Sequence, residues 1–231
     1  MCFSASASLG AGVVLTAIGV ATLKKTHHSS QLLFASIPLF FGVQQIAEGI
    51  LWLTLPNPDY ANMQKIFTYV FLFFAQVLWP IWVPVAILLL EKEASRKTFQ
   101  KVLVLPGILV SAYLAYCLLT FHVEAKIVGH HITYLQDYPL YLKTHGTILY
   151  ALATIAPAFF SHIKRMWIFG IAILLSYIIS DVFYQHYVLS VWCFFASIIS
   201  LSIYAIMIEI SRPPLAWVRY SGLNPDERYW H

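Results

Sequence analysis

The chain has 231 residues, of which 60% are apolar and only 10% are charged, whereas a soluble globular domain carries about 25% charged residues. Its mean hydropathy is +0.73, and apolar stretches of about 20 residues recur along the whole length, as in proteins with several membrane-spanning helices. This composition excludes a disordered chain, a collagen, a secreted disulfide scaffold and a nucleic-acid-binding domain. The formal net charge of +4 needs no acidic partner, because the basic residues lie in loops between the apolar stretches.

The apolar stretches predict an all-α fold, a single transmembrane domain of seven helices over residues 1–231. The connections are short except for residues 123–143, which contain His130, His131 and a tyrosine-rich run. Residues 211–231 hold two prolines followed by aromatic and charged residues, which predicts an interfacial tail after the last helix. The predicted spans are residues 3–23, 32–55, 66–90, 102–122, 144–160, 167–186 and 189–210.

Basic residues are distributed unequally between the two sides of the predicted bundle. In short loops, the side that is rich in Lys and Arg faces the cytoplasm. We therefore expect a multi-pass protein of the plasma (inner) membrane, with its N-terminus outside and its C-terminus in the cytoplasm. Eleven basic residues lie on the cytoplasmic side, namely Lys24, Lys25, Lys92, Arg96, Lys97, Lys101, Lys164, Arg165, Arg212, Arg219 and Arg228, against three outside, namely Lys65, Lys126 and Lys143.

Two carboxylic acids lie well inside predicted spans. Glu48 is about 10 Å below the outer end of the second span at the rise of an α-helix, and Asp181 lies at a similar depth in the sixth. An ionisable group in hydrocarbon costs about 2.5–3.5 kcal/mol on insertion scales, so each must face the bundle interior, a water-filled cavity or a partner. Either the two acids form a ligand- or proton-binding site, or each fixes helix register through closed hydrogen bonds.

Hydrogen-bonding side chains accompany both acids at helical spacing. On the second span these are amides, and on the sixth they are phenols, so each helix presents one polar face. Two prolines four residues apart in the third span free backbone carbonyls that neighbours or water must satisfy. The predicted ligand- or proton-binding set is Glu48, Asp181, Gln44, Gln45, Gln76, Tyr177 and Tyr184.

Glu48 and Asp181 also hold equivalent places, each in the second helix of a group of three. Spans one to three and five to seven share one orientation if the fourth span is an inverting linker. This layout predicts a 3+1+3 parallel repeat, as in some transporters, with a site on the axis between the halves.

The chain opens with Met-Cys-Phe-Ser-Ala-Ser-Ala-Ser, and it has Gln-Gln-Ile-Ala-Glu-Gly in the second predicted span and Ser-Val-Trp-Cys-Phe-Phe-Ala in the seventh. With these motifs it resembles a family of uncharacterised bacterial multi-pass membrane proteins that begin with Met-Cys-Phe-Ser-Ala. The resemblance extends over the whole chain and implies a membrane bundle without implying an activity.

Three classes of function remain open. The first is a protein that transports or binds a small ligand in an outward-facing polar cavity, coupled to protons through Glu48 and Asp181. The second is a membrane-embedded, hydrolase-like enzyme that binds a divalent metal near the outer surface through His122, His145 and His186. The third is a sensor or assembly partner that transports nothing.

The sequence requires no cofactor and names no partner beyond the lipid bilayer and a small ligand. Three thiols, Cys2, Cys117 and Cys193, fall in the outer third of the predicted bundle. They could form one disulfide, or they could act as small buried apolar groups.

Overall fold

Four helices of the structure are long and apolar enough to cross a membrane, over Ala5–Leu23, Ser29–Thr54, Pro58–Leu90 and Ala94–Thr120. At about 1.5 Å per residue, each reaches about 28 Å or more, close to the ~30 Å hydrocarbon thickness of a bilayer. Three shorter apolar helices cover Gly146–Phe159, Met166–Ser180 and Ile199–Ser211 in the part of the chain with described side chains. The protein is therefore largely helical, with helices suited to a membrane.

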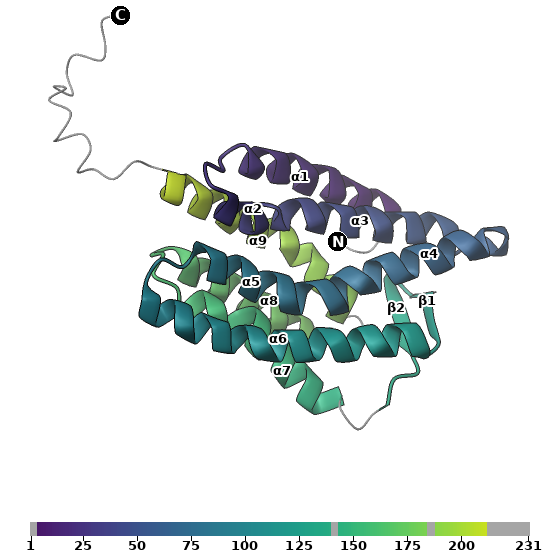
Figure 1. The fold of residues 1–231 in the computed structure, drawn as a ribbon. Helices are drawn as coiled ribbons and strands as arrows, with labels where there is room; N and C mark the ends of the chain where they lie inside the picture. The colour runs from purple at the N-terminus through teal and green to yellow at the C-terminus, as the bar shows by residue number, and fades with distance from the viewer. Residues whose placement is uncertain (1–3, 140–142, 184–187, 212–231) are drawn as a thin grey trace, which may run out of the picture.

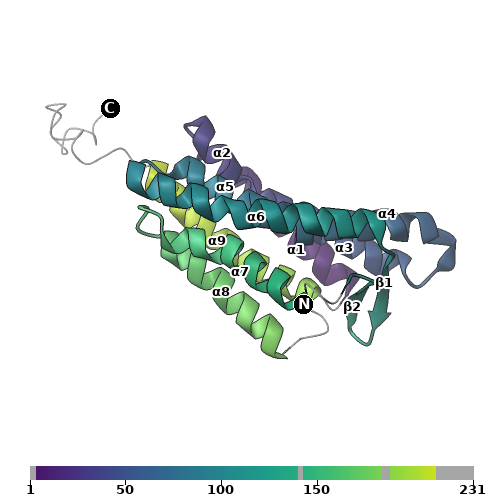
Figure 2. The ribbon, with the colours of Figure 1, turned by 60° about the horizontal axis from the view of Figure 1, so that its bottom comes forward.

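The computed structural model describes residues 4–139, 143–183 and 188–211. The helices lie side by side along one long axis, with a β-hairpin at one end and the α5–α6 turn at the other (Figures 1 and 2). In chain order the elements are α1 (Ala5–Leu23), a 3-10 turn (Ser29–Gln31), α2 (Leu32–Ala35), α3 (Ile37–Thr54), a 3-10 turn (Pro58–Tyr60), α4 (Ala61–Leu72), a π-helical segment (Phe73–Leu78), α5 (Trp79–Leu90), α6 (Ala94–Thr120), β1 (Val123–Val128), β2 (His131–Gln136), α7 (Lys143–Phe159), α8 (Met166–Phe183) and α9 (Val188–Ser211).

The helices fall on the predicted apolar stretches, with two early starts. The helix that contains α4 and α5 begins at Pro58 rather than at residue 66, and α6 begins at Ala94 rather than at residue 102. Both extra segments are polar, so a search for apolar residues alone could not include them. The 3+1+3 repeat stays a prediction.

The all-α prediction is wrong in one place, because the long connection forms an antiparallel β-hairpin. Val128 pairs with His131, which leaves a two-residue turn whose first residue, Gly129, has φ +62°. Glycine at that position fits the turn geometry that matches the twist of two strands. A two-stranded sheet is marginal alone, and here its inner face packs on the helices with Val123, Ala125 and Ile132.

Helices α1 and α3 approach each other closely because glycines face the contact. A Cβ atom on Gly19 would lie 2.6 Å from the backbone nitrogen of Leu39, so a larger residue does not fit. Gly12 and Gly42 lie in the same contact, against Ile46 and Thr16 respectively. Small residues that let backbones approach are the usual basis of helix packing in membranes.

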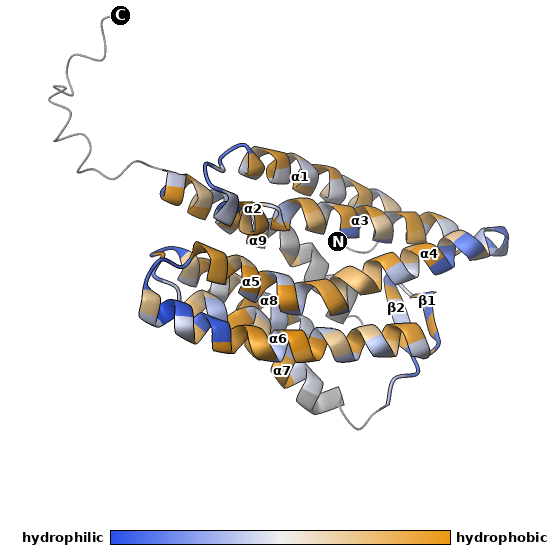
Figure 3. Ribbon diagram, in the orientation of Figure 1, coloured by the Kyte–Doolittle hydropathy of each residue, from blue (hydrophilic) through white to orange (hydrophobic). Residues whose placement is uncertain are grey.

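The largest buried apolar cluster joins α2, the start of α3, α5, α7, α8 and α9. Apolar side chains also cover the outward faces of the helices, as the orange ribbons of Figure 3 show. Val13 is 66% exposed, Leu105 56% and Leu119 81%. Soluble monomers rarely expose so much continuous apolar surface, and hydrophilic residues gather at the two ends of the bundle (Figure 3).

Candidate functional site

The carboxyl group of Glu48 lies inside the bundle on α3, with no solvent exposure. The side-chain amide of Gln45, also buried, donates a hydrogen bond to Glu48 Oε2 at 3.2 Å. The two residues are three apart on one helix, as the helical spacing predicts. An ionisable group at this depth of an apolar helix is a candidate for a functional site.

Gln44, on the same helix, joins α3 to α5. The indole nitrogen Nε1 of Trp79 donates to Gln44 Oε1 at 2.9 Å, and both side chains are buried. This bond ties the polar face of α3 to α5, the helix that contains Pro80 and Pro84.

A cavity of about 40 Å³ lies beside this bond. It has room for about two or three water molecules, and its wall is mostly apolar, whereas the sequence predicts a polar cavity open to the outside. Gln44 belongs to the wall, and neither Glu48 nor Gln45 does. The lining residues are Ile37, Phe41, Gln44, Ala75, Trp79, Val83, Tyr150, Thr154, Phe169, Ile173 and Ile199.

The cavity borders the π-helical segment Phe73–Leu78, whose freed carbonyls find side-chain partners. The Trp79 N–H bonds to the Phe74 carbonyl five residues back, and Pro80 has no N–H for the next carbonyl, that of Ala75. The hydroxyl of Tyr150 on α7 donates to this carbonyl at 2.7 Å. Such π-helical turns are common at functional sites.

A second carbonyl is freed at Pro80, because Pro84, four residues later, also lacks an N–H. Gly107 of α6 lies directly against the Pro80 carbonyl oxygen, and any Cβ there would overlap with it. On the same face of α6, Ser111 Oγ donates to the carbonyl oxygen of Val77 at 2.7 Å. The sequence predicts that neighbours satisfy the carbonyls freed by the prolines. The bond from the Tyr150 hydroxyl to the Ala75 carbonyl meets this expectation.

Gln76 bonds to the connection that carries the hairpin. Its Nε2 donates to Gln136 Oε1 at 3.0 Å, and its Oε1 accepts from the Tyr138 hydroxyl at 3.1 Å. Burial is the main cause that raises the pKa of Tyr138, so this hydroxyl stays protonated and remains a donor. Gln76 thus fastens the hairpin to the bundle, a role that the sequence did not indicate.

The second predicted acid lies outside the described side chains. Asp181 is in α8, whose backbone is described there, and Tyr184 lies outside the described residues altogether. Tyr177, one turn before Asp181, is half-buried. The predicted pairing of Glu48 with Asp181 therefore stays a prediction.

The predicted metal ligands are only partly described. His122 is exposed just after α6, the side chain of His145 lies outside the described part, and so does all of His186. Among the described residues, no three His, Cys, Asp or Glu side chains gather as a metal site would require.

Of the predicted thiols, Cys117 is a buried free cysteine on α6. Cys2 and the side chain of Cys193 lie outside the described part of the chain. The disulfide that the sequence allows among the three thiols stays a prediction.

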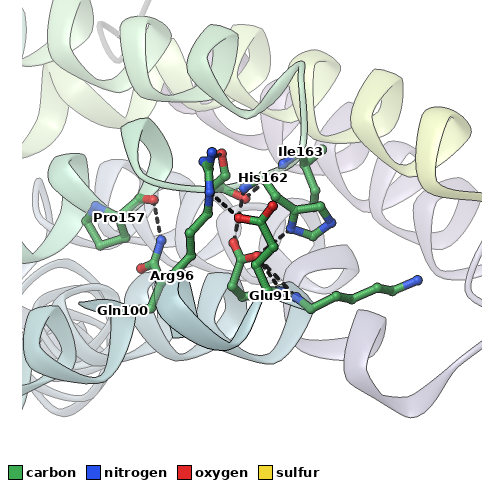
Figure 4. Close-up of polar contacts among 9 residues, drawn as sticks. Glu91, Arg96, Gln100, Pro157, His162 and Ile163 are labelled. Atoms are coloured by element: carbon green, nitrogen blue, oxygen red, sulfur yellow. Dashed lines mark hydrogen bonds and ion pairs between the residues drawn. The ribbon is translucent and has the colours of Figure 1, made fainter. Parts of the chain in front are cut away.

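The sequence analysis missed a buried glutamate at the end of the bundle opposite the hairpin. Glu91 follows α5, and its side chain has no solvent exposure. Its Oε1 lies 2.7 Å from His162 Nδ1 and accepts from the Lys92 and Glu93 amides, while its Oε2 accepts from the His162 amide at 3.1 Å. Figure 4 shows the group, which joins the α5–α6 turn to the α7–α8 turn.

Two further bonds join the same segments. Arg96 Nη1 donates to the carbonyl of Ser161 at 2.9 Å, and Gln100 Nε2 donates to that of Pro157 at 2.8 Å (Figure 4). We call Glu91, Arg96, Gln100 and their partners Pro157, Ser161 and His162 the Glu91 clamp. In the sequence, Glu91 reads as the first charge of an ordinary loop, so no pattern marks it as buried.

Opposing influences act on the pKa of Glu91. Burial, the largest, raises it, but the hydrogen bonds from the His162 and Glu93 amides and the nearby imidazole together outweigh burial. The net pKa is lower than that of an ordinary glutamate. Glu91 is thus an ionised carboxylate whose charge is compensated.

No curated protein and no solved structure matches the chain. A family described as "Family of unknown function (DUF6629)" matches residues 1–217. This agrees with the expected membership in a family without an assigned activity. The match covers nearly the whole chain, including every described helix and the hairpin, and the protein belongs to this family.

Proposed function

We propose that the protein is a seven-span protein of the plasma (inner) membrane, with its N-terminus outside. Four helices of spanning length, the three shorter apolar helices and the apolar outward faces support this proposal. The basic residues support the orientation, because Lys24, Lys92 and Lys164 all lie in turns at the end of the bundle away from the hairpin. In this orientation the hairpin is outside and the Glu91 clamp faces the cytoplasm.

Labelling of single cysteines in intact cells tests the topology. Asn57→Cys lies in the turn between α3 and α4 and should react with a membrane-impermeant thiol reagent, while Lys97→Cys on α6 should not. Both are placed in a chain whose native cysteines are replaced by alanine. Labelling of position 97 from outside would contradict the arrangement.

Within this arrangement, we propose that the protein binds or transports a small ligand beside Glu48, with proton binding at this carboxyl group. The complete burial of Glu48 on a membrane-spanning helix carries the proposal. A buried carboxyl group can exchange its proton as its surroundings change, and this is how such groups couple protons to ligands.

The cavity supports the proposal through Gln44, which lies on the polar face of α3 and also lines the cavity. At about 40 Å³, the cavity is far smaller than the 300–1,000 Å³ of usual ligand sites. A ligand therefore enters only if helices move apart. Its apolar wall favours a ligand with an apolar body and few polar groups.

Thermal unfolding of purified protein with a panel of small amphipathic compounds tests this function, because a ligand of the folded state raises the melting temperature. We expect compounds that stabilise the wild type to lose this effect in Glu48→Gln. Glu209→Gln is the matched control, since Glu209 lies near the end of α9 and pairs with Arg165 at 3.4 Å. Equal stabilisation of Glu48→Gln and wild type, at every pH, would contradict the assignment.

A further inference from the structure

The Glu91 clamp connects two turns that are far apart in the sequence. The α5–α6 turn supplies Glu91, and the α7–α8 turn supplies His162, 71 residues later. Figure 4 shows that the carboxylate lies between the two turns, with the Gln100 bond to Pro157 beside it. The contact thus holds together the ends of four helices, α5 to α8.

The chemistry of the clamp makes it hard to open halfway. Three of the donors to Glu91 are backbone N–H groups, from Lys92, Glu93 and His162, and both carboxylate oxygens accept. If the α7–α8 turn moves away, Glu91 loses the His162 amide and imidazole together. The buried carboxylate must then take up water or a proton. Opening of the clamp would therefore replace this bonded arrangement by a hydrated or protonated one.

The cavity lies farther from the α5–α6 and α7–α8 turns than the clamp does, toward the middle of the bundle. Thr154 in its wall is five residues, or about 8 Å, before the end of α7. Phe169 is three residues, or about 5 Å, after the start of α8. Val83 belongs to α5 and lies eight residues, or about 12 Å, before Glu91. Separation of the two turns would move these three wall residues apart from one another.

We propose that the Glu91 clamp is a gate that closes the cavity toward the cytoplasm. The proposal rests on the proposed seven-span arrangement and on ligand binding in the bundle. The clamp is closed in this structure, so a ligand inside the cavity would reach the cytoplasm only after the α5–α6 and α7–α8 turns part. Three of the donors to Glu91 are backbone N–H groups held in place by their turns. The two turns can therefore come together in only one arrangement.

Chemical labelling of the cavity wall tests the gate without any ligand. Thr154→Cys is placed in a chain with Cys2, Cys117 and Cys193 replaced by alanine, and a small methanethiosulfonate reagent is added to inverted membrane vesicles. We expect slow labelling with an intact clamp. Glu91→Gln should label at least about tenfold faster, because an amide has one acceptor oxygen for donors on both sides.

Three further variants make the outcome decisive. Lys101→Gln is the control, since Lys101 lies on α6 next to the clamp but is exposed and is not a member of it. It should label at the slow rate. Leu51→Cys, fully buried on the outer half of α3, should stay unlabelled in every clamp variant, which shows that the bundle is folded. His162→Ala keeps the backbone donors, so it should cause a smaller increase than Glu91→Gln.

Labelling of Thr154→Cys at the wild-type rate in Glu91→Gln and His162→Ala, with Leu51→Cys protected, would overturn the gate and leave the clamp a structural tie. Labelling of Leu51→Cys in His162→Ala would overturn it too, because a gate must open while the bundle stays folded. Failure of ligand binding at Glu48 would leave these labelling rates unaffected, so the two proposals can fail separately.

Discussion

Two glutamates are fully buried in the described part of the chain, Glu48 and Glu91, and their surroundings differ in kind. Glu91 accepts hydrogen bonds from backbone amides of two different turns, and a histidine side chain adds to them. One donor to Glu48 is the side chain of Gln45, on the same helix. Backbone donors in a turn are fixed in place, whereas a glutamine side chain can rotate away.

The difference shows how burial can lead to opposite roles. Fixed donors favour the charged form of a carboxyl group in every state of the protein in which the turn is intact. A donor that can rotate leaves the preference between the charged and neutral forms open to change. This contrast supports the proposed roles, in which Glu91 holds helices together and Glu48 binds a proton or a ligand.

Truncation of Glu91 should give the largest effect on stability. Glu91→Ala leaves buried N–H groups on two turns without an acceptor, and we expect a loss of about 3 kcal/mol in the free energy of unfolding. Unfolding of purified protein in detergent, followed by circular dichroism, measures this loss. A loss as small as that of the Glu93→Ala control would mean that the two buried glutamates do not differ as described.

The next largest effect on stability should come from acid, through protonation of Glu91. Its pKa in the folded protein is lowered, so its contribution to stability is present above the unfolded pKa of about 4.3. That contribution is lost as the pH falls through the pKa of Glu91 in the folded protein. We expect the melting temperature of the wild type to fall more steeply than that of Glu91→Gln below about pH 5. Parallel curves for the two proteins would contradict the assignment of Glu91 as an ionised group.

Loss of the bond between α3 and α5 should have a moderate effect. Trp79→Phe keeps an aromatic ring in the cavity wall but removes the N–H that donates to Gln44, and we expect a loss of about 1 kcal/mol. Trp167→Phe is the control, because Trp167 is 53% exposed on α8. Thermal unfolding of both variants at the same pH measures the difference.

The smallest effect on stability should come from Glu48→Gln. The amide has nearly the same shape and can still accept a hydrogen bond from Gln45, so we expect a change of about 0.5 kcal/mol or less. The tryptophan fluorescence of the wild type in lipid nanodiscs should nevertheless depend on pH, through Trp79 beside Gln44, and this dependence should be absent in Glu48→Gln. A large loss of stability would assign Glu48 to register-fixing instead.

The sequence predicts the helices well because hydrophobic length alone decides where a membrane helix forms. It also places Gln45 on the face of Glu48, since residues three apart on a helix are neighbours. The hairpin could have been anticipated from alternating residues around Val128-Gly129-His130-His131, which fits a two-residue turn. Long apolar runs, on which the helix prediction rests, do not reveal it.

The Glu91 clamp could not be predicted. Its bonds join residues about 60 to 70 positions apart, such as Arg96 with Ser161 and Glu91 with His162. Nothing in the local pattern distinguishes Glu91 from its exposed neighbour Glu93. Only the packing of α6 against α7 decides which of the two carboxylates becomes buried.

The hairpin has a consequence for experiments on the whole protein. Two strands alone are only marginally stable in water, so the six residue pairs from Val123–Gln136 to Val128–His131 depend on their contact with the helices beneath. The amide hydrogens of these strands should therefore exchange with deuterium whenever the hairpin lifts from Phe71 and Leu118. Their rate of exchange measures the free energy of that lifting directly, which makes the hairpin a natural reporter of the state of this end of the protein.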